Sequence, residues 1–148
     1  MQPALDRPTH PVSVGAVRIG VVLPTREAAI SGHNDPDQLV RFARDCEHLG
    51  FDSVWAGDSL LARPRLEPLT LLAAIAAHTE HLTIRTAALT PAIRHPLPAA
   101  HSIATLDRIS NGRLIVALGA GFPYAETAAD FARSGCRSPG GCNGCARP

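Results

Sequence analysis

Short apolar runs alternate along the chain with longer segments whose apolar residues recur at helical spacing. The runs are rich in β-branched residues and predict strands, and the longer segments predict helices. The expected strands cover 17–23, 51–56, 82–89 and 113–118, and the expected helices cover 35–49, 67–78, 97–109 and a shorter stretch at 124–133. Residues 26–34 are polar, contain a glycine and predict a loop. This alternation indicates a parallel sheet with right-handed crossovers.

Local signals mark where the helices begin and end. Asp35-Pro36 combines a capping carboxylate with a proline at the first helical position, and Gly50 follows the last turn. Glu67-Pro68 repeats the start signal, and the helix after it is apolar on nearly all sides, which is typical of a helix packed between neighbours. The periodicity fits both an open doubly wound sheet and part of a barrel, and it does not separate the two.

The composition indicates one globular domain and removes several classes of function. Of the 148 residues, 45% are hydrophobic and 18% are charged, and the formal net charge is +1. Nucleic acids and anionic membranes require a clustered basic surplus, which this sequence lacks. No apolar run reaches the roughly 18 residues of a membrane span, and the cytoplasm is the expected compartment. We therefore predict a small-molecule substrate, with no nucleic-acid and no membrane partner.

Five sequence blocks carry a family resemblance in their order along the chain. They are RIGVVLP at 18–24, LGFDSVWAGD at 49–58, EPLTLLAAIAAHT at 67–79, RHP at 94–96, and IATLDRISNGR with LGAGF at 103–113 and 118–122. Together they resemble the luciferase-like monooxygenase family of flavin- and deazaflavin-dependent oxidoreductases. The family fold is a (β/α)₈ barrel of about 250 residues. The resemblance implies an α/β fold in which 17–133 form the N-terminal half of that barrel, with four parallel strands and three to four helices.

The resemblance also implies where a cofactor would bind. Barrel enzymes build their sites from the loops that follow the C-terminal ends of the strands. The implied cofactor-binding residues at those ends are Trp55, Asp58, Ala87, Ala88, Thr90, Gly119 and Gly121. No metal ligands and no catalytic residue are identified.

Each of these positions has an expected role and, for some, an ordinary structural alternative. Asp58 is expected near the flavin or deazaflavin ring; the alternative is that Trp55 is a packing residue and Asp58 caps a loop. The family's third strand ends in a bulge with a non-prolyl cis peptide bond behind the ring, which falls near Ala87-Ala88. For His95, a structural role in capping backbone groups is favoured over a catalytic one.

Two chemistries remain open for the complete enzyme. A reduced flavin such as FMN supports oxygenation of a substrate, whereas a deazaflavin exchanges hydride with a small molecule. The residues present do not choose between them, and they do not name the substrate. The alternative function is a non-catalytic, frameshifted fragment that is inactive alone or needs a partner to complete the barrel. A half-barrel has unpaired strand edges and an exposed interior, which favour a homodimer or aggregation.

The two ends of the chain differ from its middle. Residues 1–16 are expected to form a mobile leader, and 134–148 form a tail rich in cysteine, glycine and proline that is expected to be disordered. A shifted reading frame from Gly135 onward spells a family-like continuation for suitable codon choices, so the tail is interpreted as a frameshift product. The competing interpretation is a zinc or redox site at Cys136, Cys142 and Cys145, although a structural zinc needs four ligands.

Overall fold

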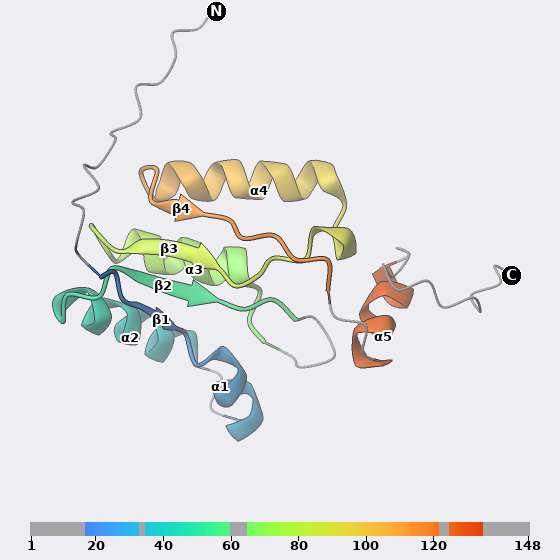
Figure 1. Cartoon of the computed structure of the whole chain (residues 1–148), viewed down its shortest axis with the longest axis horizontal. Coiled ribbons are helices and arrows are strands. Elements are labelled where there is room, and N and C mark those ends of the chain that lie inside the picture. The colour runs from blue at the N-terminus through green and yellow to red at the C-terminus, as the bar shows by residue number, and fades with distance from the viewer. Residues whose placement is uncertain (1–16, 33–34, 60–64, 122–124, 135–148) are drawn as a thin grey trace, which may run out of the picture.

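Four parallel strands and five α-helices make up the described part of the chain, with one short 3₁₀ helix (Figure 1). The structure is a computed structural model that describes residues 17–32, 35–59, 65–121 and 125–134. In chain order the elements are β1 (Gly20–Val22), α1 (Thr25–Ser31), α2 (Pro36–His48), β2 (Ser53–Ala56), α3 (Pro68–Ala77), β3 (Thr83–Thr86), η1 (Pro91–Ile93), α4 (Pro96–Ile109), β4 (Leu114–Ile115) and α5 (Ala125–Ser134). The expected leader and the cysteine-containing tail lie outside the described residues, apart from Ser134.

The sheet has the strand order β1-β2-β3-β4, with every neighbouring pair parallel. Residues that pair across parallel strands point to the same face of the sheet. Val21, Val54, Ile84 and Leu114 form one such row, which packs against the helices. The next row is Val22, Trp55, Arg85 and Ile115, and none of its members is fully buried.

The sequential strand order and the single covered face distinguish the two architectures that periodicity left open. A doubly wound sheet reverses its strand order and carries helices on both faces. Consecutive units of a (β/α)₈ barrel instead keep their order and place the helices outside, with the inner face directed at the barrel interior. The arrangement is therefore that of four consecutive barrel units. We call the row Val22, Trp55, Arg85 and Ile115 the open face.

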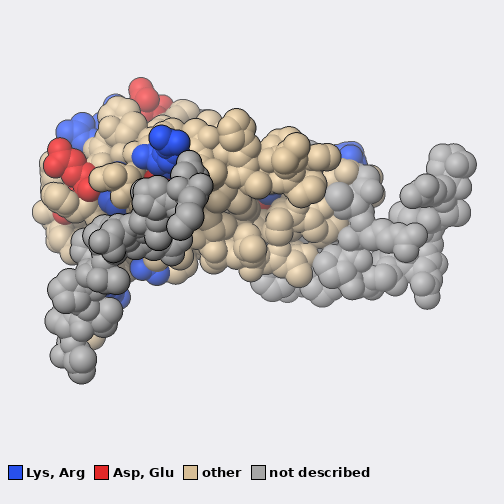
Figure 2. Space-filling view, turned by 90° about the horizontal axis from the view of Figure 1, so that it is seen from above, with Lys and Arg blue, Asp and Glu red and all other residues tan. Residues whose placement is uncertain are grey.

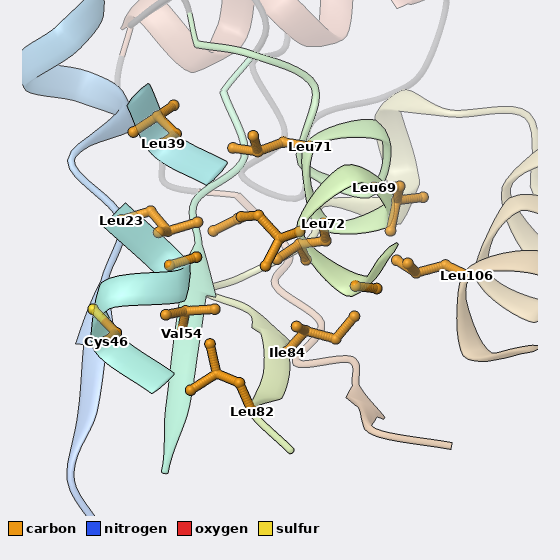
Figure 3. Close-up of a cluster of buried hydrophobic side chains, with 14 of the residues drawn as sticks. Leu23, Leu39, Cys46, Val54, Leu69, Leu71, Leu72, Leu82, Ile84 and Leu106 are labelled. Atoms are coloured by element: carbon orange, nitrogen blue, oxygen red, sulfur yellow. The ribbon is translucent and has the colours of Figure 1, made fainter. Parts of the chain in front are cut away.

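The hydrophobic core lies between the sheet and helices α2, α3 and α4 (Figure 3). Helix α3 buries residues on several sides because α2 and α4 flank it, as its apolar composition predicts. At about 25 cal/mol per Å² of buried apolar surface, this layer is the main source of stability. Its buried members include Leu23, Leu39, Cys46, Val54, Leu69, Leu71, Leu72, Leu82, Ile84 and Leu106.

The expected loop at 26–34 is wrong over most of its length, because α1 occupies Thr25–Ser31. Glu27 lies in the first turn, where a negative charge is favourable, and Ala28 and Ala29 are strong helix formers. Gly32 then ends the helix in the left-handed conformation, with φ at 73°. The glycine is therefore a helix C-cap. The short helix expected at 124–133 is confirmed as α5.

Two charged side chains join elements at the N-terminal ends of the strands. The Glu47 carboxylate, in the last turns of α2, accepts backbone N–H groups from Glu80, His81 and Leu82 at 2.6–3.2 Å. Arg113, just before β4, donates to the carbonyl oxygen of Leu82 at 2.7 Å, to that of Ala76 in the last turn of α3, and to that of Thr79 just after α3. Polar groups at this edge of a barrel serve stability, because the binding loops lie at the opposite edge.

Candidate functional site

The loops after β2 and β3 are held together by Asp58. Its carboxylate accepts the backbone N–H of Thr90 at 2.8 Å and both terminal nitrogens of Arg94, with Nη1–Oδ2 at 2.5 Å and Nη2–Oδ1 at 3.0 Å. The Asp58 side chain is 1% exposed and that of Arg94 is 14% exposed. Such a bidentate ion pair is geometrically specific and rigid. The structural interpretation of Asp58, in which it caps a loop, is the one that these contacts favour.

Arg94 also contacts a second carboxylate, that of Glu67 at the start of α3. Its Nη2 donates to Glu67 Oε1 at 3.0 Å, while the other Glu67 oxygen caps α3 by accepting the Thr70 N–H at 2.7 Å. Burial raises the pKa of Glu67, but the hydrogen bonds from Thr70 and Arg94 outweigh it and leave the pKa below its ordinary value. Burial lowers the pKa of Arg94, and Asp58 and Glu67 more than reverse that effect. We call Asp58, Glu67 and Arg94 the Arg94 cluster.

A surface of small residues lies beside this cluster, where β3 and β4 end. The Ala87–Ala88 peptide bond is cis, as the family resemblance implies. Beyond this bond the segments that follow β3 and β4 stay paired, because the Leu89 N–H donates to the Ala117 carbonyl and the Gly119 N–H donates to the Leu89 carbonyl, each at 2.8 Å. A side-chain carbon built on Gly119 would lie 3.1 Å from the Ala88 methyl carbon, which is a tight contact. We call Ala87, Ala88 and Gly119 the shelf.

Trp55 and Arg85 lie next to each other on the open face. The register pairs the two residues across β2 and β3, and the Arg85 guanidinium carbon lies 4.8 Å from the centroid of the Trp55 ring. The Trp55 indole N–H donates to Ser53 Oγ at 3.1 Å. Trp55 is therefore directed away from the helix-covered core and packs against Arg85.

The structure brings together only some of the residues expected at the site. Asp58 meets Thr90, and Ala88 meets Gly119, whereas no described contact joins Trp55 to either pair. Gly121 ends the described stretch with φ at 84°, a conformation that favours glycine.

One expectation about a neighbouring residue is wrong, and two residues of the site were not predicted. His95 occupies the N-cap position of α4, but its imidazole makes no capping hydrogen bond, so the expected capping role is wrong. The importance of Arg94 and Glu67 was missed. Arg94 stands 36 positions from Asp58 and 27 from Glu67, so no local pattern could have revealed the cluster. Glu67 was recognised only as a helix start.

A separate groove of about 590 Å³ lies between α3 and α4, on the helix side of the sheet. Its lining includes Glu67, Arg94 and His95 along with apolar residues of both helices. Figure 2 looks onto the molecule from the side of α4; charged side chains gather toward the end where α4 finishes, and the middle of this face carries few. None of the helices in the described ranges is long and apolar enough to span a bilayer.

Comparison with protein families and curated sequences adds a second line of evidence. Residues 17–135 match the luciferase-like monooxygenase family. The F420-dependent glucose-6-phosphate dehydrogenase of Amycolatopsis mediterranei is 37% identical over 100 residues, which cover 63% of this chain and 30% of that enzyme. The chain thus spans about 30% of the length of the curated relatives that it matches first.

Solved structures of similar fold also extend well beyond this chain. The monooxygenase RslO1 from Streptomyces bottropensis superposes with a TM-score of 0.67 at 29% identity, over 82% of this chain and 37% of that one. The oxygenating constituent of 3,6-diketocamphane monooxygenase from Pseudomonas putida, solved in complex with FMN, gives a TM-score of 0.67 over 78% of this chain and 33% of that one. At 23% identity, the second likeness concerns the fold alone.

Proposed function

The chain belongs to the luciferase-like monooxygenase family, and from that premise we propose that it supplies cofactor-facing strands of an oxidoreductase that uses FMN or a deazaflavin coenzyme. The observation that carries the proposal is the shelf at the ends of β3 and β4, where Ala88 and Gly119 bring two backbones close together. Ligand sites of barrel enzymes lie at this edge of the sheet.

The shelf fits a flat aromatic ring. A ring can lie against backbone only where no long side chain projects, and the shelf consists of two alanines and a glycine. Ala87, Ala88 and Gly119 would hold the cofactor ring, and Thr90 and Gly121 lie on the same two loops. Asp58 has an indirect role in this account, because Thr90 and Arg94 occupy its carboxylate.

The chemistry of the complete enzyme would come from the cofactor: a bound flavin supports oxygenation, and a bound deazaflavin exchanges hydride with a small molecule. The residues of this chain position that cofactor. The Arg94 cluster ties the β2 loop to the β3 loop, which keeps the shelf in a fixed place relative to the strand ends. Preorganisation of this kind lowers the cost of ordering a site when a ligand binds.

A binding titration of the full chain tests this proposal. FMN and coenzyme F420 are titrated separately, with the fluorescence of each cofactor as the signal. We expect one of them to bind saturably, and Gly119→Val to weaken that affinity by at least about tenfold, or about 1.4 kcal/mol, because the new side chain meets Ala88. Ala104→Val, on the exposed surface of α4, is the matched control and should leave the affinity unchanged.

Failure of both cofactors to bind, or equal binding by Gly119→Val, would contradict the proposal. The alternative function, a non-catalytic fragment that associates through its exposed interior, has its own structural support. Val22 is 63% exposed and Leu118 is 64% exposed, and apolar exposure of this kind favours association. Sedimentation velocity on the same samples separates the two: an associated chain that binds neither cofactor supports the fragment.

A further inference from the structure

Arg85 is the one charged residue in the open-face row, whose other members are Val22, Trp55 and Ile115. It projects from β3 on the side of the sheet that no described helix covers. Val22 and Ile115, the outer members of the row, are 63% and 46% exposed, whereas Arg85 is half-buried beside Trp55. A cation among apolar neighbours requires a polar partner once water is removed from that face.

The contacts of Arg85 leave this requirement unmet within the described ranges. Its Nε is buried and has no hydrogen-bond partner, and the guanidinium takes part in none of the ion pairs formed among the described residues. Other arginines of the fold differ sharply, because Arg94 pairs with two carboxylates and Arg113 donates to several carbonyl oxygens. Arg85 is held in place and keeps donors available.

Trp55 holds the Arg85 guanidinium in place. Its ring lies under the guanidinium at 4.8 Å, a favourable cation–π arrangement, and its indole N–H is fixed by Ser53 Oγ. Gly20 on β1 makes room for this arrangement, since a side-chain carbon there would collide with both Ser53 Oγ and the indole nitrogen. Three strands thus contribute to the orientation of one arginine.

We propose that Arg85 and Trp55 form a binding site for the carboxylate or phosphate group of a small molecule. A guanidinium presents several N–H donors in one plane, which match the oxygens of such anions, and an aromatic ring behind it restricts its rotation. Arg85 lies on β3 two positions before the shelf residue Ala87. The site therefore goes beyond the proposed cofactor function and specifies an anionic substrate class for the same end of the barrel.

The single tryptophan of the chain is Trp55, so intrinsic fluorescence reports directly on this site. Inorganic phosphate is titrated into the full chain at constant ionic strength, with chloride as the replaced ion, and succinate is the carboxylate probe. We expect a saturable change in Trp55 emission with at least one probe. Arg85→Met should remove the change, and Arg85→Lys should weaken apparent affinity at least about fivefold because lysine lacks the planar donor set.

Arg108→Met is the matched control, since Arg108 is an exposed arginine on α4, and it should respond like the wild type. Urea unfolding verifies that each variant folds. A change in Trp55 emission that does not saturate in the wild type, or an equal change in Arg85→Met, overturns the proposal. The proposal is also overturned if the Trp55 emission changes with protein concentration but not with phosphate or succinate. That result would assign Arg85 to a carboxylate of a second copy of the chain.

The cofactor titration repeated on Arg85→Met separates this proposal from the proposed function. Retained FMN or F420 binding together with a lost anion response supports two distinct positions. If the wild type binds neither cofactor but still responds to phosphate or succinate, the cofactor function is contradicted and the anion site is retained.

Discussion

Replacing Arg94 by methionine is expected to lower the free energy of unfolding by about 3 kcal/mol. The reason is the fate of Asp58, whose side chain is 1% exposed and would lose its only described cationic partner. The Thr90 N–H would remain as its hydrogen-bond donor, which does not neutralise the charge. Urea unfolding of the full chain measures the loss.

Two comparison variants make the Arg94 measurement specific. Arg41→Met removes an exposed pair with Asp35 at 3.7 Å, with side chains 63% and 44% exposed, and should cost less than about 1 kcal/mol. The double variant Asp58→Asn, Arg94→Met should recover part of the lost unfolding free energy, since Asp58→Asn removes the buried carboxylate charge that Arg94→Met leaves unpaired. Equal costs for Arg94→Met and Arg41→Met would show that the Arg94 cluster does not fix the strand-end loops.

Glu47→Gln is expected to cost about 1.5 kcal/mol of unfolding free energy at pH 7. The carboxylate accepts three backbone N–H groups where β3 begins, and a neutral amide accepts them more weakly. Burial raises the pKa of Glu47, but the bonds from His81, Leu82 and Glu80 and the charge of Arg113 outweigh it, and the pKa lies below its ordinary value.

The pH dependence follows from that direction. A carboxyl group with a lowered folded-state pKa contributes its stability fully above its unfolded pKa of about 4.3, and the contribution is lost as pH falls through the lower folded-state value. The difference between wild type and Glu47→Gln should therefore shrink in acid. Glu80→Gln is the control, because its side chain is 88% exposed, and a difference of the same size there would refute the assignment.

The element types were predictable from sequence because strands and helices have different hydrophobic periods. All four strands and the helices that follow them were expected near their observed positions. Helix α1 was not predicted because a polar stretch that contains a glycine is also typical of a loop, although Ala28 and Ala29 favour a helix and Gly32 caps it. The choice between an open sheet and a barrel needed the register, which periodicity does not contain.

The candidate site was less predictable, for a physical reason. Positions after strand ends can be listed from sequence, and Ala87–Ala88 was found in this way through the family resemblance. The partner of a buried charge cannot be found from sequence in this way, because Asp58 and Arg94 are 36 positions apart and only the folded chain brings them together. Arg85 was visible as a charge inside a strand, but the sequence does not show that its strand face lacks a helix.

The most direct test of the central claim is a map of the cofactor's contacts by ¹H–¹⁵N NMR on the labelled full chain. FMN and F420 are added in turn, and amide shifts are followed. If the shelf holds the cofactor ring, the largest shifts are expected at Ala88, Thr90 and Gly119, where the shelf meets the loop held by Asp58. Shifts confined to the groove between α3 and α4, or none at saturating cofactor, would contradict it.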